Sequence, residues 1–467
     1  MRDWHGKRVV ILGAARQGVA LARWLTGHGA RVTLSDKRTE ETLASARASL
    51  QGLSVEWVFG GHPVEMLDQA DMLCLSGGVP TNLPIVEEAA KRNIELSNDT
   101  QIFMEAVPCK TVGITGSAGK TTTTTLVGHM ANLAVKEAGT KNGAPWKAFV
   151  GGNIGDPLIS YLDDMRPMDL AILEISSFQL EQLTFSPNIA AVLNITPNHL
   201  DRHGTMEAYT AAKSRILAFQ SRADVAVLGR DDPGAWGLRD SARGRLNSFG
   251  FSKIEEDGEG TYFDDGLLVL YEHHVDIPLL RREQIRLRGA HNVMNVLAAF
   301  AIGHAAGLPL DAMLSAAEEF TGVAHRLEFV RNRAGVCWYN DSIATAPERT
   351  IAAIHSFDEP IVLLLGGRDK NLPWEALAKL VRQRVDHVIL FGEAAGKVEK
   401  ALEADTTSAR PYSQKRVSTL HEAVLEAERV AKPGDVVLLS PGGTSFDEFS
   451  DFEERGEKFR LWVQELS

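Results

Sequence analysis

The sequence is poor in cysteine and in aromatic residues. Its 467 residues include three cysteines, Cys74, Cys109 and Cys337, and only 7% Phe, Trp and Tyr. An odd number of cysteines without metal-like spacing excludes a small disulfide scaffold. It predicts buried thiols in a reducing compartment.

Positive charge is also scarce. The chain has 49 Lys and Arg residues against 61 Asp and Glu residues, which gives a formal net charge of -12. Broad binding to nucleic acid usually needs a basic face. We therefore expect no nucleic-acid partner, although a local basic pocket remains compatible with this charge.

Long apolar runs are absent as well. No apolar stretch approaches the ~20 residues that a membrane helix needs. The first residues contain only the apolar run Val9–Leu12, which is too short for the core of a signal peptide. These absences predict a cytoplasmic protein without membrane insertion.

What the chain does contain is an alternation of buried strands and helices. Hydrophobic residues make up 44% and charged residues 24%, as is typical of globular proteins. At ~150 residues per domain, the length predicts about three domains. Apolar runs predict strands at residues 8–12, 31–35, 72–76, 94–96, 110–114, 170–174, 190–194, 336–340, 361–366, 387–391 and 435–440. Helical spacing predicts helices at 19–26, near 84–92, from Lys120 onwards, and at 292–306.

This alternation favours an α/β fold of three domains, each with a mostly parallel sheet. Breaks near 107–108 and 321–322 place the domains at residues 1–107, 108–322 and 323–467. The stretch 247–280 is rich in turn residues, and we expect a small antiparallel patch or surface insertion there. In α/β domains, ligands bind at the carboxyl ends of the strands.

The strongest local pattern is GITGSAGKTT at residues 113–122, between a predicted strand and a predicted helix. Glycines let backbone N–H groups surround a phosphate, and the helix N-terminus adds a favourable dipole. Lys120 would reach the β- and γ-phosphates, and the Thr121 hydroxyl would bind Mg²⁺. The strict pattern G-x-x-x-x-G-K-[ST] needs glycine at position 114, where this chain has Ile114.

A weaker glycine pattern lies near the N-terminus. Gly13–Gly18 reads G-x-A-x-x-G, and Asp36 closes the following strand. The spacing resembles that of a dinucleotide-binding turn. Ala15 argues against the usual close approach of a pyrophosphate, so another nucleotide-like group is as consistent with this turn as NAD.

Polar residues follow two of the central strands. Glu174 ends the strand 170–174, with Ser176 and Gln179 just beyond it, and His199 follows the next strand. A carboxylate at a strand end is where a phosphate-loop enzyme needs a Mg²⁺ ligand or a group that orients water. A lone histidine is usually structural, but beside Glu174 and Thr121 a functional role for His199 is favoured.

Three clusters of glycine, hydroxyl and charged residues follow strands in the last third of the chain. They are residues 339–345, 366–370 and 440–447. Clusters of this kind favour a pocket for a small polar substrate. Lys370 could pair with a carboxylate there, and Ser445 could donate a hydrogen bond to another.

Taken in order, these segments resemble the Mur ligase family. The resemblance covers essentially the whole chain and rests on GITGSAGKTT, GGNIG (151–155), LEISSFQLE (173–181), NITPNHLDRHG (194–204), AAKSRI (211–216), GAHNVMN (289–295), AHRLE (324–328), NDSIAT (340–345), GGRDK (366–370) and SPGGTSFDEF (440–449).

The resemblance implies an N-terminal Rossmann-like domain, a central phosphate-loop ATPase-like domain and a C-terminal Rossmann-like domain. It also implies an ATP-dependent carboxylate–amine ligase of peptidoglycan precursor synthesis, a process on which cell shape and division depend. The most similar branch adds D-glutamate to UDP-N-acetylmuramoyl-L-alanine through an acyl phosphate. The implied cofactors are ATP, two Mg²⁺ ions and a lysine carbamylated by CO₂, and the implied state is a monomer.

Site roles follow from the resemblance position by position. The ATP site would comprise Gly116, Ser117, Ala118, Gly119, Lys120, Thr121, Thr122, Asn292, Arg326 and Asp341. The catalytic residues would be Lys120, Glu174, His199 and Lys213, and the metal ligands Thr121, Glu174, His199 and Lys213 as its carbamate. The UDP-substrate would contact Arg16, Gln17, Asp36, Lys37, Ser76, Gly78, Asn153, Ser176, Gln179 and His199. Glutamate would contact Thr345, Lys370, Ser445 and Phe452.

Several positions depart from the family pattern. Ile343 replaces a lysine, Arg16 and Gln17 replace a Leu-Thr pair, and Gly77 replaces a proline. These departures concern the glutamate and UDP contacts rather than the phosphoryl chemistry. The alternatives are a ligase that adds L-glutamate or another amino acid, a folylpolyglutamate-type ligase, and a nucleotide-binding regulator without catalysis. The N-terminal domain disfavours the folylpolyglutamate type, and the set Lys120, Glu174, His199 and Lys213 disfavours the regulator.

Overall fold

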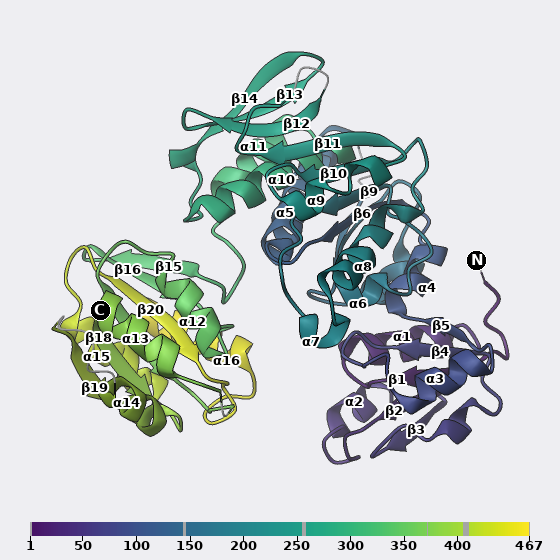
Figure 1. Ribbon diagram of the computed structural model, residues 1–467, viewed down its shortest axis with the longest axis horizontal. Coiled ribbons are helices and arrows are strands. Elements are labelled where there is room, and N and C mark those ends of the chain that lie inside the picture. The colour runs from purple at the N-terminus through teal and green to yellow at the C-terminus, as the bar shows by residue number, and fades with distance from the viewer. Residues whose placement is uncertain (1, 143–145, 255–257, 371, 405–410, 467) are drawn as a thin grey trace. The chain divides into compact units, whose positions relative to one another are not determined.

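The computed structural model describes residues 2–142, 146–254, 258–370, 372–404 and 411–466. Three β-sheets, each covered by helices, follow one another along the chain (Figure 1). The chain divides into two compact units. The first contains Met1–Arg286 and Ala290–Phe320, and the second contains Leu287–Gly289 and Thr321–Ser467.

The first sheet has five parallel strands in the order β3-β2-β1-β4-β5. Its strands are β1 (Arg8–Leu12), β2 (Arg31–Asp36), β3 (Val55–Phe59), β4 (Met72–Leu75) and β5 (Glu95–Ser97). Its helices are α1 (Arg16–Gly27), α2 (Ala44–Ser49), the 3₁₀ helix η1 (Val64–Leu67), α3 (Pro84–Lys91) and α4 (Asp99–Ala106).

The second sheet has nine strands in the order β14-β13-β12-β11-β10-β9-β6-β8-β7. They are β6 (Lys110–Thr115), β7 (Ala148–Gly152), β8 (Leu170–Glu174), β9 (Ile189–Val192), β10 (Val225–Gly229), β11 (Arg245–Gly250), β12 (Glu259–Asp264), β13 (Leu267–Glu272) and β14 (Val275–Arg281). The accompanying helices are α5 (Lys120–Asn142), η2 (Leu158–Asp164), α6 (Ser177–Leu180), α7 (Leu200–His203), α8 (Met206–Ala218), α9 (Pro233–Trp236), η3 (Arg239–Ser241), η4 (Arg282–Gln284), α10 (Ala290–Ala306) and α11 (Leu310–Glu319).

The segment 247–280 agrees only in part with the expectation of a small antiparallel patch or surface insertion. Strand β11 pairs in parallel with both β10 and β12, and only the pairs β12–β13 and β13–β14 are antiparallel. The segment therefore extends the central sheet. The turn residues of the segment do not indicate that β11 and β12 pair in parallel. Residues 255–257 of the segment lie outside the described part of the chain.

The third sheet has six strands in the order β15-β16-β20-β17-β18-β19, parallel except for the pair β15–β16. They are β15 (Glu328–Arg333), β16 (Val336–Asn340), β17 (Ile361–Gly366), β18 (Val385–Phe391), β19 (Ser413–Arg416) and β20 (Val436–Gly442). Its helices are α12 (Pro347–Ile354), α13 (Glu375–Arg384), α14 (Ala395–Ala404), α15 (Leu420–Val430) and α16 (Phe452–Glu465).

Apolar runs explain why these sheets are covered on both faces. In β17, Ile361, Leu363 and Leu365 belong to one buried cluster, while Val362 and Leu364 belong to another on the opposite face. Parallel strands buried on both faces are near-continuous Val, Ile and Leu runs, as here. The mostly parallel α/β fold expected from the sequence is confirmed.

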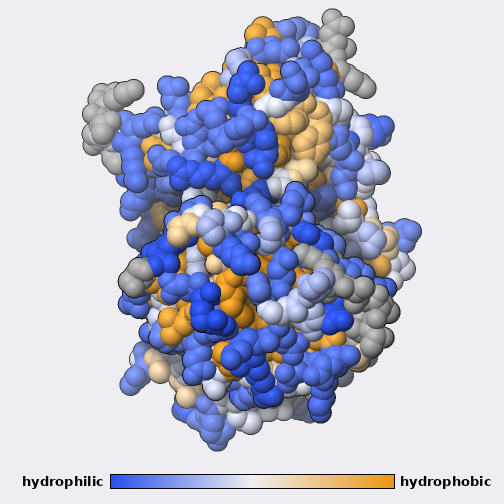
Figure 2. All heavy atoms as spheres, turned by 90° about the vertical axis from the view of Figure 1, so that its left-hand side faces the viewer, coloured by the Kyte–Doolittle hydropathy of each residue, from blue (hydrophilic) through white to orange (hydrophobic). Residues whose placement is uncertain are grey.

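In contrast to the buried strands, the surface is mainly hydrophilic on the face that Figure 2 shows. Hydrophilic residues cover most of the face seen in Figure 2, with hydrophobic residues in patches between them. Within the described residues, no helix combines the length and apolar character needed to cross a bilayer.

The domain boundaries 1–107, 108–322 and 323–467 stay a prediction, although each sheet falls inside one of these ranges.

Candidate functional site

The turn between β6 and α5 is shaped by close packing around Gly119. Gly119 has a φ of 82°, and a Cβ there would lie 2.3 Å from the Asn295 Oδ1 atom. Only glycine suits this position, because L side chains rarely adopt that backbone conformation. Asn194 supports the turn, since its side-chain oxygen accepts the Ala118 N–H (2.8 Å) and its amide donates to the Ala118 carbonyl (3.1 Å).

Two lysines meet inside this turn. Lys120 Nζ donates to the Gly116 carbonyl at 2.8 Å, and Lys213 Nζ donates to the same oxygen at 3.0 Å. Lys213 also donates to Thr115 Oγ1 at 3.3 Å and lies 4.8 Å from the centroid of the Tyr209 ring. The structure therefore brings together two of the predicted catalytic residues, which are 93 positions apart in the chain.

The environment of Lys213 disfavours its charged form. Its side chain is 1% exposed. Burial lowers the pKa of Lys213 to about 7, helped by the charge of Lys120 and opposed by that of Glu174. A substantial fraction of neutral amine is therefore expected near pH 7.

Glu174 ends β8 beside this lysine pair and is 2% exposed. Its Oε1 accepts a hydrogen bond from Asn153 Nδ2 at 2.7 Å, and its buried Oε2 has no partner among the described residues. An unpartnered buried carboxylate oxygen is a suitable ligand for a hard cation or a hydrogen-bond donor. In the described part of the chain, no group of three or more His, Cys, Asp or Glu side chains is arranged to hold a metal.

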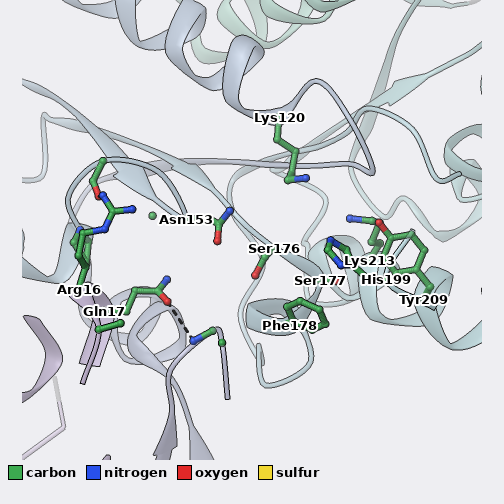
Figure 3. A pocket seen from close by; sticks show the side chains of 16 residues that line it. Arg16, Gln17, Lys120, Asn153, Ser176, Ser177, Phe178, His199, Tyr209 and Lys213 are labelled. Atoms are coloured by element: carbon green, nitrogen blue, oxygen red, sulfur yellow. Dashed lines mark hydrogen bonds between the residues drawn. The ribbon is translucent and has the colours of Figure 1, made fainter. Parts of the chain in front are cut away.

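A cavity of about 420 Å³ connects this region to the first sheet. In Figure 3, Arg16 and Gln17 lie at one end, Lys213 and Tyr209 at the other, and Asn153 and Ser176 between them. Of the predicted catalytic and UDP-substrate residues, those that line the cavity are Arg16, Gln17, Gly78, Lys120, Asn153, Ser176, His199 and Lys213. Arg16 Nη1 donates to the Gly155 carbonyl at 3.2 Å, so it already links the two domains that flank the cavity.

Four other predicted substrate residues are absent from the cavity lining. The Asp36 carboxylate is 5% exposed, accepts the Ala14 N–H (2.7 Å) and pairs with the Arg38 guanidinium (2.9 and 2.8 Å). The Arg38 guanidinium holds the pKa of the Asp36 carboxyl well below its usual range. Ser76 Oγ donates to the Gly13 carbonyl at 2.9 Å, and Lys37 is exposed.

Gln179 is the fourth of these residues. It is 1% exposed, accepts the N–H and hydroxyl of Ser176 (2.9 and 3.0 Å) and donates to Thr100 Oγ1 at 2.8 Å. It therefore holds Ser176 at the N-cap of α6. Of the other residues predicted for metal or ATP, Thr121 and Thr122 lie in the first turn of α5, and His199 has a left-handed backbone (φ 53°) just before α7.

The residues predicted for glutamate lie in the second unit. Thr345, Lys370 and Ser445 follow β16, β17 and β20, three strands that are neighbours in the sheet. The loops after β17 and β20 are joined by paired hydrogen bonds between Arg368 and Thr444 (2.8 Å each way). Phe452 begins α16.

The residues predicted for ATP are divided between the units. Asn292 lies in the first unit on α10 and accepts a hydrogen bond from Asn295 Nδ2 at 3.0 Å, while Arg326 and Asp341 lie in the second. Burial raises the pKa of Asp341 to about 7, against the hydrogen bond that Ser440 Oγ donates to it at 2.8 Å. Arg326 is exposed.

Sequence reasoning missed several residues of the cavity and its support. Tyr209, 1% exposed, shares a hydrogen bond with Ser117 of the phosphate loop (3.1 Å) and lines the cavity with Phe178. The sequence places Asn194 only at the end of the predicted strand 190–194. Asn194 and Tyr209 are far from the phosphate loop in the sequence, so no local spacing indicates their contacts with it.

Comparison with known proteins matches each third of the chain. The Mur ligase MurD-like N-terminal domain matches residues 7–98, the Mur ligase middle domain 114–303, and the Mur ligase glutamate ligase domain 325–443. The UDP-N-acetylmuramoylalanine–D-glutamate ligase of Symbiobacterium thermophilum is 40% identical over 99% of this chain and 98% of its own length. The ligase of the same name from Pelotomaculum thermopropionicum is 38% identical over 100% of this chain and 99% of its own length.

Solved structures share the fold. The UDP-N-acetylmuramate–alanine ligase of Thermotoga maritima has a TM-score of 0.56 at 19% identity and covers 99% of this chain and 100% of its own. The MurF ligase of Thermotoga maritima in complex with ADP has a TM-score of 0.52 at 16% identity and covers 100% of this chain and 100% of its own. Because the family models match each of its three parts and the relatives match it over its full length, the chain belongs to the Mur ligase family.

Proposed function

We propose that this protein is an ATP-dependent ligase that joins D-glutamate to UDP-N-acetylmuramoyl-L-alanine in peptidoglycan precursor synthesis. The observation that carries the proposal is the full-length similarity, at 38–40% identity, to relatives named UDP-N-acetylmuramoylalanine–D-glutamate ligase. The cavity adds support, because it runs from the first sheet to the phosphate-loop lysine. Such a cavity suits an elongated substrate with a nucleotide at one end and a reactive carboxylate at the other.

The proposed reaction makes a poor acylating agent reactive. The substrate carboxylate oxygen attacks the γ-phosphorus of ATP, the bond to the bridging oxygen breaks, and ADP leaves. The amine of glutamate then attacks the acyl phosphate, loses a proton, and displaces inorganic phosphate to leave an amide. Lys120, at the start of α5, would bind the transferring phosphoryl group and stabilise its charge.

The residues around Glu174 fit a divalent cation, because its buried Oε2 has no partner among the described residues. Thr121, His199 and Lys213 as its carbamate would complete the ligands of two Mg²⁺ ions. When bound, Mg²⁺ would neutralise charge on the phosphates and the substrate carboxylate. The hydrogen bond from Asn153 would hold the Glu174 carboxylate in place, so that its other oxygen could bind the cation.

Carbamylation of Lys213 is part of the proposal. Its neutral Nζ would form a bond to the carbon of CO₂ while the electron pair of one C=O π bond moves to oxygen and one N–H proton leaves. The product is a carbamate, which offers an oxygen ligand where the amine had none. The support is its burial between Thr115, Gly116 and Tyr209, beside Glu174.

Lys213→Ala should lower turnover at least ~10²-fold, because loss of one charge-stabilising group typically costs a few kcal/mol. Short carboxylic acids should restore part of the rate, since they replace the lost carboxylate. Lys110→Ala is the matched control, because Lys110 is a second lysine with a lowered pKa but binds the carbonyls of Ala305 and Ala306 instead. Full activity of Lys213→Ala, or loss without rescue, would contradict the carbamate.

We also propose that the enzyme works as a monomer in the cytoplasm, where ATP is supplied. Light scattering after size-exclusion chromatography would test this, and a stable dimer at assay concentration would contradict it.

The test of the proposed function is phosphate release that depends on Mg²⁺, ATP and UDP-N-acetylmuramoyl-L-alanine. D-Glu, L-Glu, L-Ala, L-Lys and diaminopimelate are offered separately, and the product is weighed by mass spectrometry. Turnover with D-Glu alone is the expected result. Turnover with L-Glu would overturn the stereochemistry, and no turnover by folded, ATP-binding protein would overturn the proposed function.

A further inference from the structure

The segment after His199 carries an arginine that reaches the loop following β4. Arg202, on α7, donates from Nη1 to the Gly77 carbonyl at 3.4 Å and from Nη2 to the Val79 carbonyl. Both carbonyls belong to the first sheet's domain, whereas Arg202 belongs to the central sheet's domain. The same guanidinium therefore spans the two domains that flank the cavity.

Arg202 is held in place by a layer of rings. Its guanidinium carbon lies 3.7 Å from the centroid of Phe178, within the range of a cation–π contact. Phe178 stacks on His203 at 5.1 Å with an interplanar angle of 5°. His203 in turn lies 2.9 Å from Ser177 Oγ and 3.3 Å from Glu181.

The loop that Arg202 holds is part of the cavity wall. Gly77 and Gly78 line the cavity, and the Gly77 N–H donates to Gln17 Oε1 at 3.2 Å, as the dashed line in Figure 3 marks. Phe178 and His199 line the same cavity from the other side. One residue thus connects both walls without lining the cavity itself.

We propose that Arg202 is a positioning residue for the nucleotide-bearing substrate. By bonding two carbonyls of the 77–79 loop, it fixes the distance between the walls that the substrate must span. The inference rests on the proposed function and goes beyond it, because it assigns the spacing of the two walls to a residue outside the phosphate loop and the cavity lining.

Three variants test this inference. Arg202→Ala removes both hydrogen bonds and the ring contact, whereas Arg202→Lys keeps the charge but not the planar fork. Arg215→Ala is the matched control. Arg215 also donates to two carbonyls, those of Leu180 (3.1 Å) and Leu183 (2.6 Å), and lies 5.4 Å from a ring centroid, that of Phe219. All of these partners lie in the central sheet's domain and away from the cavity lining.

Steady-state kinetics are measured for each variant, with circular dichroism to confirm folding and calorimetric titration with UDP alone. Arg202→Ala should raise the KM for UDP-N-acetylmuramoyl-L-alanine at least ~10-fold, equal to about 1.4 kcal/mol, and weaken UDP binding. The kcat and the KM for ATP should change by less than about threefold, as expected for lost substrate binding. Arg202→Lys should lie between wild type and Arg202→Ala, and Arg215→Ala should leave this KM unchanged.

An unchanged KM for the nucleotide substrate in the Arg202 variants would overturn the inference. So would a fall in kcat with all KM values unchanged, or the same KM rise in Arg215→Ala. If Arg202→Ala is unfolded, Arg202→Lys decides by the same criteria. If wild type does not turn over the substrate, the proposed function has failed, and UDP titration of wild type and variants still decides the role of Arg202.

Discussion

Asp99 shows how burial sets the charge of a single residue in this protein. It lies in the first turn of α4, is 5% exposed, and its Oδ1 has no hydrogen-bond partner among the described residues. Burial raises the pKa of Asp99 to about 6, against the hydrogen bonds that lower it. The folded protein therefore holds a proton at Asp99 in a pH range where the unfolded chain does not.

Asp99→Asn should stabilise the protein at pH 8. Because the folded pKa exceeds the unfolded value, the native state loses stability as pH rises from about 4 to about 6 and then carries a constant penalty. A shift of about two pKa units corresponds to at most about 3 kcal/mol. Urea unfolding of both proteins at pH 8 and pH 4 would measure the difference.

The gain from Asp99→Asn should disappear at pH 4, where the native carboxyl is protonated. Asp164→Asn is the control, because Asp164 is exposed and reports the general effect of losing one negative charge. An equal gain at both pH values would contradict the argument.

Single residues at strand ends were the part of the site that sequence could indicate. Glu174 is the last residue of β8 and Lys120 is the first residue of α5, so local spacing predicted their place. Arg202 and Tyr209 could not be found in this way. Arg202 contacts residues more than 100 positions away, and only the folded chain brings them together.

At the scale of elements, helix α5 has an unusual polar beginning inside the protein. Five consecutive threonines, 121–125, follow Lys120. The hydroxyls of Thr123 and Thr124 are fully buried and lack a hydrogen-bond partner among the described residues. A buried hydroxyl without a partner costs about 1–3 kcal/mol. The start of α5 is therefore less stable than its packing would allow.

Thr124→Val should raise the free energy of unfolding by up to about 1 kcal/mol, because it replaces an unpaired hydroxyl with a methyl of similar size and keeps helix propensity nearly constant. Urea unfolding measures the change. Thr125→Val, at a half-buried position, is the control and should have a smaller effect. Destabilisation by Thr124→Val would show that its hydroxyl is paired.

Many strands with continuous apolar runs were predicted, because burial on both faces leaves a clear pattern, as in β8 and β17. The fully buried strand β10 was nevertheless missed. The edge strands β3, β7, β15 and β19 were missed. β3 is mostly half-buried and β19 is largely exposed, so neither has the apolar run of a central strand. The parallel pairing of β11 with β12 was also missed, because pairing partners are set by tertiary contacts.

At the scale of the whole molecule, one buried cluster joins the first two sheets. Trp24 of α1 and Leu158, Ile159 and Leu162 of η2 belong to the same cluster. Trp24 Nε1 also donates to Asp163 Oδ1 at 3.1 Å. The first two sheets should therefore unfold together.

Trp24→Ala should destabilise the first unit by about 3–5 kcal/mol, the usual cost of removing a buried aromatic ring. Hydrogen exchange followed by mass spectrometry should show lost protection in both β1–β5 and β6–β11. Trp338→Ala, at a 1% exposed position in β16, is the matched control and should affect the second unit. Loss confined to β1–β5 in Trp24→Ala would contradict a shared core.

The contact between α1 and η2 also limits how this protein can be recombined with its relatives. Trp24 and Asp163 are 139 positions apart, so a crossover near residue 107 would inherit them from different parents. A chimaera made at that point would set a foreign helix against Leu158–Asp164. Functional hybrids should therefore need both segments from one parent, and gene shuffling should recover crossovers after residue 164 more often than between 28 and 157.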